Sequence, residues 1–315
     1  MDRRHFLCAG AALAAAAQAE AAVAPAGIPI IDTHVHLFDA RRPQGVPYGG
    51  SPEWEKKSGG VALPSTYDAY AAPLNIVGAI VLEASPWVED NLWVLEQIQR
   101  DTRFVGLIGD IEPEKPDFPQ LLERHAKNPL FLGIRCGNIW DRDISAQSTD
   151  PRFLSGLKRL ADAGLTMDSA NPTVPLLQAI LRISDAVPSL RIVLDHLPSL
   201  DPTPAEQGAY DAALRDIAAR PQIYAKLSEI DHRGHLGGVA AHRERLDMLM
   251  ARFGEDRVVF GTDWPNSWGV ATPQQIVSVA RAYFATRGTA AAEKFFWRNS
   301  QAAYRWKKRA PRQPG

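Results

Sequence analysis

The sequence predicts an α/β fold, a single-domain (β/α)8 TIM barrel, from three observations. Eight short apolar runs alternate with amphipathic segments from residue 30 onward. The runs are apolar throughout rather than at every second position, which is typical of a parallel sheet whose faces are covered by helices. No glycine-rich fingerprint follows the first run, so a closed barrel is favoured over an open dinucleotide-binding sheet.

The individual elements are predicted in strict alternation. The expected strands cover residues 28–34, 75–85, 103–111, 130–136, 165–170, 190–196, 222–228 and 257–264. Segments with helical spacing of apolar residues cover 91–100, 118–127, 152–164, 174–186, 209–220 and 242–254. We therefore predict one barrel over residues 28–306.

The two ends of the chain are predicted to lie outside the barrel. Residues 1–21 combine Arg3 and Arg4 with an apolar stretch and an alanine-rich end, which is typical of a cleaved twin-arginine-type export signal. This predicts a periplasmic protein. The basic residues 307–315 have no periodicity and are predicted to form a disordered tail. Residues 37–63 form a long Gly- and Pro-rich loop, which predicts a lid or binding loop.

The composition narrows the possible partners. The chain has 315 residues, 45% of them hydrophobic, and a formal net charge of -1. This balance indicates no nucleic-acid partner, and the apolar stretch near the N-terminus is too short to predict a membrane span. Removal of the signal would leave Cys136 as the single thiol, which we interpret as a core residue rather than a nucleophile. No oligomeric state is predicted.

The residues DTHVH at positions 32–36 are the first chemical signal. Side chains alternate along a strand, so His34 and His36 are expected on one face. The carboxyl ends of the strands of a TIM barrel meet at one face, where active sites lie. Polar residues occur at nearly every predicted strand end: Asp32, His34, His36, Glu83, Ser85, Arg135, Asp168, Asp195, His196, Lys226, Ser228 and Asp263. They indicate a shared polar site.

Several of these residues have predicted roles in binding. Arg135 and Lys226 at the rim predict a substrate with a carboxylate or another anionic group. Ser85 and Trp264 are further candidates for substrate binding, and the other aromatic residues on this face are Tyr48, Trp54, Trp87, Trp140 and Trp268. Asp195, directly before His196, is expected to point to the outer side of the barrel if the strand stays regular. The remaining histidines of the chain proper are interpreted as structural: His125, His232, His235 and His242.

Three motifs resemble those of a known family. DTHVH ends the first strand, DH the sixth and FGTDWP the eighth, followed by WRNSQAAYRW. In this order they resemble the amidohydrolase superfamily, and within it the amidohydrolase-related branch with the 2-pyrone-4,6-dicarboxylate and sugar-acid lactonases. The resemblance implies a hydrolase in which Asp263 activates a water. It also implies that His34, His36 and His196 polarise the carbonyl and protonate the leaving group.

The sequence departs from the metal-using members of this superfamily at two strand ends. Those members have a histidine after the fifth strand and often a carboxylated lysine on the fourth. At these two places this chain has MDSAN and GIRC, respectively. His34, His36 and Asp263 could still hold a zinc ion weakly, since three protein ligands suffice for a catalytic site. We therefore expect either no required cofactor or one divalent metal.

The leading hypothesis is a hydrolase that opens a small carboxylated or sugar-derived lactone. The alternative keeps the barrel but assigns a metal-dependent amidohydrolase or decarboxylase. A third hypothesis is a non-catalytic binder of a periplasmic solute.

Overall fold

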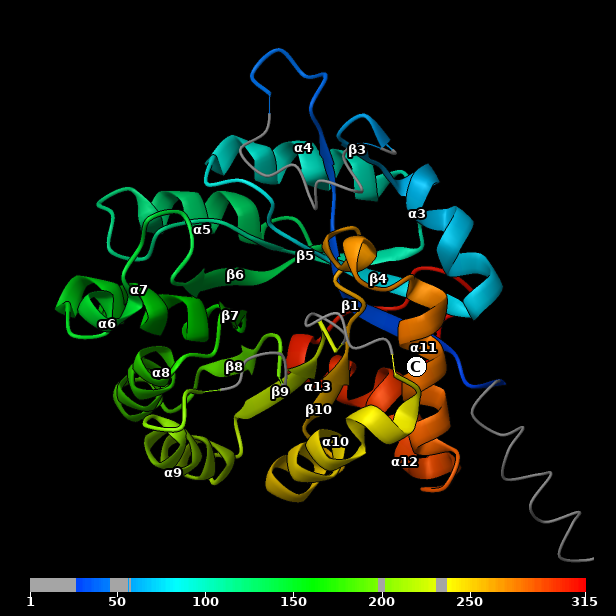
Figure 1. Cartoon of the computed structure of the whole chain (residues 1–315). Helices are drawn as coiled ribbons and strands as arrows, with labels where there is room; N and C mark the ends of the chain where they lie inside the picture. The colour runs from blue at the N-terminus through cyan, green and yellow to red at the C-terminus, as the bar shows by residue number, and fades with distance from the viewer. Residues whose placement is uncertain (1–26, 46–55, 57, 198–201, 231–236) are drawn as a thin grey trace, which may run out of the picture.

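The computed structural model describes residues 27–45, 56, 58–197, 202–230 and 237–315. Eight strands form one parallel sheet in the order β1-β4-β5-β6-β7-β8-β9-β10 (Figure 1). Their bounds are Ile30–His36 (β1), Ile76–Leu82 (β4), Phe104–Gly109 (β5), Phe131–Gly137 (β6), Thr166–Ala170 (β7), Arg191–Leu194 (β8), Ile223–Leu227 (β9) and Val258–Phe260 (β10). All eight predicted strands are present, and the predicted TIM barrel is confirmed.

The barrel closes between β1 and β10. The backbone N–H of His36 donates to the carbonyl of Trp264 at 2.8 Å. The hydroxyl of Thr33 donates to the carbonyl of Phe260 at 2.7 Å. Because these bonds join β1 to β10 and to Trp264 beyond it, the residues that follow both strands lie next to each other in space.

Helices surround the sheet, as Figure 1 shows. Their bounds are Pro64–Ala71 (α3), Val88–Gln99 (α4), Phe118–Ala126 (α5), Ile144–Gln147 (α6), Pro151–Asp162 (α7), Val174–Ala186 (α8), Gln207–Ala218 (α9), Val239–Phe253 (α10), Pro273–Phe284 (α11), Thr289–Glu293 (α12) and Asn299–Tyr304 (α13). The structure also describes a π-helix, η3 (Lys294–Arg298), and two 3-10 segments, η1 (Ala72–Leu74) and η2 (Asn266–Gly269). Helices α6, α7, α8 and α11 begin at a residue whose side chain accepts a backbone hydrogen bond of the first turn, and α11 has a full Thr272–Gln275 capping box.

The core lies between the sheet and the helices and inside the barrel. Every residue of β1, β4, β5 and β6 is buried. Burial on both faces explains why these strands are apolar runs rather than alternating ones. No helix among the described residues combines the length and the apolar character that crossing a bilayer requires.

The C-terminal tail corrects one prediction. Residues 307–315 were expected to be disordered, yet Gln313 is buried and its amide donates to the carbonyls of Val77 at 3.0 Å and Thr102 at 2.8 Å. The guanidinium of Arg309 donates to four backbone carbonyls, those of Ile98, Gln99, Asp101 and Phe104. The tail therefore packs across the amino-terminal ends of β4 and β5.

Two other predicted segments fall wholly or partly outside the described residues. These are the export signal at 1–21 and part of the long loop at 37–63, including Tyr48 and Trp54. The described part of the loop contains an antiparallel pair of short strands, β2 (Phe38–Asp39) and β3 (Val61–Ala62). His232 and His235 also lie outside the described residues.

Candidate active site

Two histidines and one aspartate meet where the barrel closes. The Nε2 atoms of His34 and His36 each lie 3.2 Å from Oδ1 of Asp263. All three side chains are buried. Asp263, three residues after β10, has a left-handed backbone with φ of 56°, which belongs to a class of strained conformations common at functional sites. The structure thus brings together the first and last of the sequence motifs.

A buried aspartate ties the two chain segments to each other. Asp32 accepts hydrogen bonds from the backbone N–H of Thr262 at 2.9 Å, the Thr262 hydroxyl at 2.6 Å and the Tyr67 hydroxyl at 2.8 Å. It also accepts from the backbone N–H of His34 at 3.2 Å. Asp32 therefore holds the end of β1 against the residues that precede Asp263.

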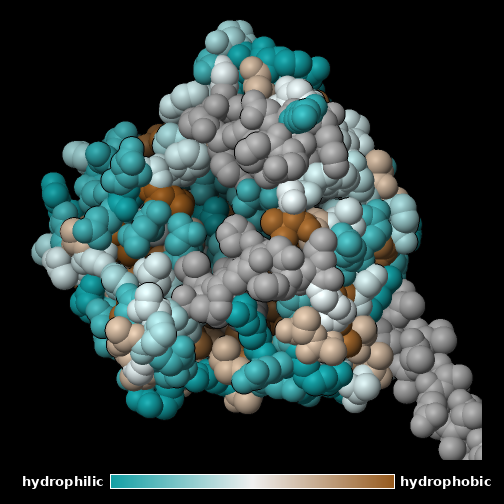
Figure 2. Space-filling model, in the orientation of Figure 1, coloured by the Kyte–Doolittle hydropathy of each residue, from teal (hydrophilic) through white to brown (hydrophobic). Residues whose placement is uncertain are grey.

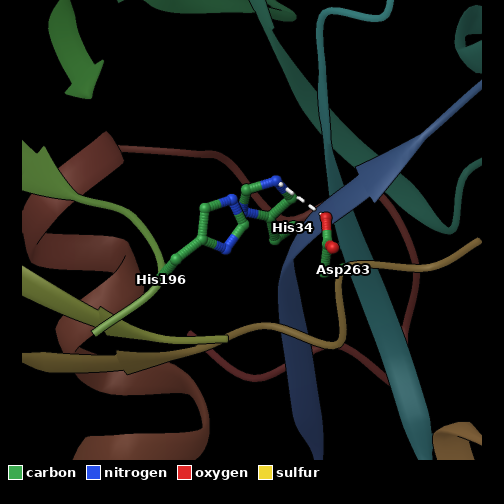
Figure 3. A group of neighbouring side chains, drawn as sticks. All are labelled: His34, His196 and Asp263. Carbon is green, nitrogen blue, oxygen red and sulfur yellow. Dashed lines mark ion pairs between the residues drawn. The ribbon is translucent and has the colours of Figure 1, made fainter. Parts of the chain in front are cut away.

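His196 comes from the end of β8 and packs against His34. The ring centroids are 4.6 Å apart, and Figure 3 shows His34 between His196 and Asp263. Nε2 of His196 lies 3.1 Å from Nη2 of Arg135, and Nδ1 lies 3.0 Å from the hydroxyl of Ser228. Because arginine only donates, Nε2 is the acceptor and Nδ1 carries the proton of the neutral ring.

Burial shifts the protonation of the central groups. It raises the pKa of Asp263 to about 7, although Asn266, Arg135 and Glu229 act to lower it. It lowers the pKa of His36 to about 4, with a further lowering from Arg135, and it lowers the pKa of His34 well below its usual value. Both histidines are therefore neutral at pH 7, while Asp263 titrates near neutrality.

The neutral ring of His36 has a defined tautomer. Its Nδ1 lies 3.0 Å from the backbone carbonyl of Glu83, so Nδ1 carries the proton and donates. Its Nε2 then presents a lone pair to Oδ1 of Asp263 at 3.2 Å. Two acceptors at this distance repel unless a proton or a cation lies between them. This contact therefore favours either a protonated Asp263 or a bound cation.

The residues fit a divalent cation by type and by distance. Among the described residues, one ligand atom each from His34, His196 and Asp263 lies within 4.8 Å of the others. Both ring nitrogens of His34 are buried without a hydrogen bond, which is consistent with a residue that coordinates a cation. A cation on Nε2 of His196 would, however, have to displace Arg135. The set differs from the predicted one, which had His36 in place of His196.

A cavity of about 260 Å³ opens onto these groups. Figure 2 shows that much of the described surface on the viewed face is hydrophilic. The lining residues are His36, Glu83, Ala84, Arg135, Ile139, Trp140, Ala170, Asn171, His196, Glu229, Asp263 and Asn266. Of the predicted substrate-binding residues, only Arg135 belongs to this set. Ser85, Lys226 and Trp264 do not, and Trp264 is fully buried against Tyr67.

Sequence reasoning missed three polar lining residues: Asn171, Glu229 and Asn266. Asn171 directly follows β7. Glu229 is the second residue after β9, directly after Ser228, and Asn266 directly follows the FGTDWP motif. The Nδ2 amide of Asn266 donates to Oδ2 of Asp263 at 2.9 Å and to Oε1 of Glu229 at 3.3 Å. Their positions just beyond predicted strand ends could have identified them as candidate site residues.

A second group of charges lies beside the cavity, away from its lining. Lys226 is fully buried, and its Nζ lies 2.6 Å from Asp168 and 2.8 Å from Asp195. Asp195 therefore points into the barrel, and the prediction that it faces outward is wrong. The reason is that β8 ends at Leu194 and His196 has a φ of 60°, so strand alternation does not extend to this pair.

Three further residues that the sequence did not assign to the site lie outside the lining of this cavity. His125 is buried in α5, where its Nδ1 lies 2.7 Å from the carbonyl of Leu121. His242 is buried in α10. Cys136 is buried within β6, and burial raises the pKa of its thiol, which disfavours the reactive thiolate.

Comparisons with known proteins identify related sequences and structures. The family model described as Amidohydrolase matches residues 31–306. An L-fucono-1,5-lactonase of Burkholderia ambifaria is 25% identical over 205 residues, which cover 65% of this chain and 70% of the relative. An L-fucono-1,5-lactonase of Burkholderia multivorans is 28% identical over 239 residues, which cover 71% of this chain and 79% of the relative. The crystal structure of a zinc-bound amidohydrolase from Burkholderia multivorans superposes with a TM-score of 0.77 at 21% identity, covering 89% of this chain and all of that one.

Proposed function

The chain belongs to the amidohydrolase family, and from that premise we propose that it hydrolyses a small lactone, with Asp263 as the general base. One observation carries the proposal. Asp263, whose pKa is raised to about 7 by burial, lines a small cavity together with Arg135. A base that titrates near the working pH is suited to accept a proton from water. Two relatives that act as L-fucono-1,5-lactonases support the choice of a lactone.

In the proposed reaction, Asp263 takes a proton from a water that attacks the lactone carbonyl carbon. The ring C–O bond then breaks, and the leaving alkoxide takes the proton back from Asp263. The product is a hydroxy acid, and Asp263 returns to its ionised form. This sequence needs a donor for the negative charge that develops on the carbonyl oxygen.

Arg135 is the donor that this geometry favours. The N–H groups of His36 and His196 are directed to the Glu83 carbonyl and the Ser228 hydroxyl, so they are not available to substrate. Arginine has five N–H groups, and three of those on Arg135 are directed to Asp195, Glu83 and His196. One N–H on each terminal nitrogen is left for the oxyanion. In this proposal Arg135, rather than the histidines that the sequence suggests, polarises the lactone carbonyl.

A metal ion is not required in this proposal. A divalent cation held by His34, His196 and Asp263 would polarise the carbonyl and acidify the water. Arg135 already supplies positive charge at the same place and engages the lone pair of His196. We therefore expect activity to survive chelation.

The charges of the lining favour an uncharged substrate over the anionic one that the sequence suggests. The described lining residues include three carboxyl groups, on Glu83, Glu229 and Asp263, and one cation, Arg135. Arg135 is already paired with Asp195 and Glu83. Carboxylates repel an anionic ligand and accept hydrogen bonds from hydroxyl groups. A neutral polyhydroxylated lactone of about one sugar ring suits this lining and this volume.

The test is a panel of lactones assayed by acid release with signal-free protein, with and without a chelator. The panel contains neutral sugar δ-lactones and γ-lactones, carboxylated lactones and simple amides. Opening of a neutral sugar lactone, unaffected by the chelator, is the expected result. Turnover of amides alone, or of no compound, would reject lactone hydrolysis, and loss of activity on chelation would reject the metal-independent route.

The arginine pair and the alanine-rich end of residues 1–21 support a periplasmic location, which remains part of the proposal. Fractionation of cells that express the full chain, with Arg3 and Arg4 both replaced by Lys as the control, tests it.

A further inference from the structure

Lys226 is an ammonium group fully enclosed by the protein. Its Nζ lies 2.6 Å from Oδ2 of Asp168 and 2.8 Å from Oδ1 of Asp195, and the Tyr304 ring centroid is 5.5 Å away. The Tyr304 hydroxyl also donates to Asp168 at 2.8 Å. This group of residues, which we call the inner charge layer, comprises Asp168, Asp195, Lys226 and Tyr304. It joins β7, β9 and α13 to the residue after β8.

A buried ion pair is weak evidence for stability. Removing charges from water is costly, and apolar residues of similar volume often stabilise a protein as well or better. The inner charge layer therefore calls for a role besides holding the barrel together. Its contacts with the candidate active site provide one.

Asp195 connects the inner charge layer to the cavity. Its Oδ2 accepts a hydrogen bond from Nε of Arg135 at 2.9 Å, while its Oδ1 faces Lys226. The same Oδ1 lies 3.8 Å from Nδ1 of His34. Lys226 and Arg135 thus hold the two oxygens of one carboxylate, and the orientation of that carboxylate sets the direction of the guanidinium.

We propose that Lys226 is a positioning residue for the hydrolysis proposed above, on which this inference rests. By holding Oδ1 of Asp195, Lys226 keeps Oδ2 directed at Nε of Arg135. Arg135 in turn stays in contact with His196 and at the cavity wall. Lys226 itself meets no substrate, because it is fully buried and lies outside the cavity lining.

The role predicts a loss in kcat rather than in KM. Without Lys226, the Asp195 carboxylate can rotate, and Arg135 loses its fixed direction. A displacement of about 1 Å in such a group can cost about 100-fold in rate. Substrate affinity depends mainly on Glu83, Glu229 and the other lining residues, so KM should change less than about threefold.

Two matched variants separate positioning from charge neutralisation. Lys226→Met leaves the buried Asp168 carboxylate without a cation, while Asp195 keeps only Arg135, and it should lower both stability and kcat. Lys226→Met combined with Asp168→Asn removes the unpaired charge of Asp168, so its melting temperature should recover while kcat stays about 100-fold low. Asp168→Asn alone keeps the contact between Lys226 and Asp195 and should retain kcat within about threefold.

The measurements are kcat, KM and melting temperature for each variant on the best lactone of the panel. Recovery of kcat together with the melting temperature in the double variant would show that Lys226 only neutralises buried acids, and would overturn the proposal. Should the double variant fail to fold, Asp195→Asn in the wild-type background replaces it. This isosteric change should also lower kcat about 100-fold with KM unchanged, and near-normal kcat would again overturn the proposal.

A readout without activity keeps this inference separate from the proposed function. Crystal structures of the wild type and the double variant show whether Nη2 of Arg135 stays in contact with His196. The proposal expects this contact to be lost in the variant, and an unchanged Arg135 contradicts it. Failure of the wild type to open any lactone would instead count against the proposed function.

Discussion

The two ends of the barrel use arginine in opposite ways. At the carboxyl ends of the strands, Arg135 contacts ionisable side chains, namely Asp195, Glu83 and His196. At the amino ends, Arg309 donates to backbone carbonyls, which carry no titratable group. The first arrangement concentrates charge where a reaction needs it. The second adds hydrogen bonds to backbone carbonyls and brings no titratable group.

This difference predicts a separation of effects. Changes at the carboxyl ends that leave no buried charge without a partner should alter turnover with little effect on folding, because the charged groups there are not the main source of stability. Changes at the amino ends should alter folding with little effect on turnover, because their hydrogen bonds hold elements far from the cavity.

Asp263→Asn should lower kcat about 1,000-fold, because the amide cannot accept a proton from water. The melting temperature should stay the same or rise, since the variant no longer buries an ionisable group. Kinetics and thermal unfolding of the same preparation check both statements. Asp256→Asn, at a side chain that is 77% exposed, is the matched control and should leave both unchanged. Equal losses of activity and stability would break the separation.

The dependence on pH follows from Asp263 with opposite signs for activity and stability. Its pKa is raised from 3.8 to about 7, so kcat/KM should fall about tenfold for each pH unit below about 7. The folded state binds this proton more tightly than the unfolded state does. The contribution of Asp263 to stability is therefore present below 3.8 and is lost as the pH rises through about 7.

Rate profiles and chemical denaturation at several pH values measure the two trends. In Asp263→Asn this component of the stability profile should vanish. A wild-type kcat/KM that is flat between about pH 5 and pH 8 would show that no group of this pKa controls the reaction.

Arg309→Ala should lower the free energy of unfolding by about 2 to 3 kcal/mol, because four backbone carbonyls lose a charged donor. The kcat should remain that of the wild type. Arg312→Ala is the control, since its guanidinium makes an exposed hydrogen bond to Asn75 and should contribute less than about 0.5 kcal/mol. A variant at Arg309 that folds as stably as the wild type would contradict the ordered tail.

Glu229→Gln should raise KM for a neutral sugar lactone about tenfold while changing kcat less, because a carboxylate accepts hydroxyl hydrogen bonds more strongly than an amide does. The measurement compares KM for polyhydroxylated and unsubstituted lactones of the same ring size. An equal change for both would remove Glu229 from substrate recognition.

The barrel could be predicted because its information is local and periodic. Each strand is an apolar run and each helix has its own spacing, so alternation alone indicated the eight units. The meeting of His34, His36 and Asp263 also followed, because strands of a parallel barrel end at one face. The same reasoning extends to Glu229, one residue after the predicted strand-end residue Ser228, and to Asn266, three residues after Asp263.

The features that the sequence analysis missed depend on individual long-range contacts, which the hydrophobic periodicity of strands and helices does not predict. Asp195 points into the barrel because His196 adopts a left-handed backbone, and no sequence pattern predicts this irregularity. Lys226 was placed at the rim, yet it precedes the end of β9 by one residue and its side chain is enclosed by two carboxylates. The tail is ordered by single hydrogen bonds from Arg309 and Gln313 to distant carbonyls, in a segment without periodicity.

A single turnover in ¹⁸O-labelled water, with enzyme in excess over the lactone, tests the role of Asp263 as a base most directly. If Asp263 deprotonates an attacking water, mass spectrometry should find one ¹⁸O in the carboxylate of the first product and none in the protein. An unlabelled first product, with ¹⁸O in the peptide that contains Asp263, would show a covalent acyl-enzyme and contradict the account.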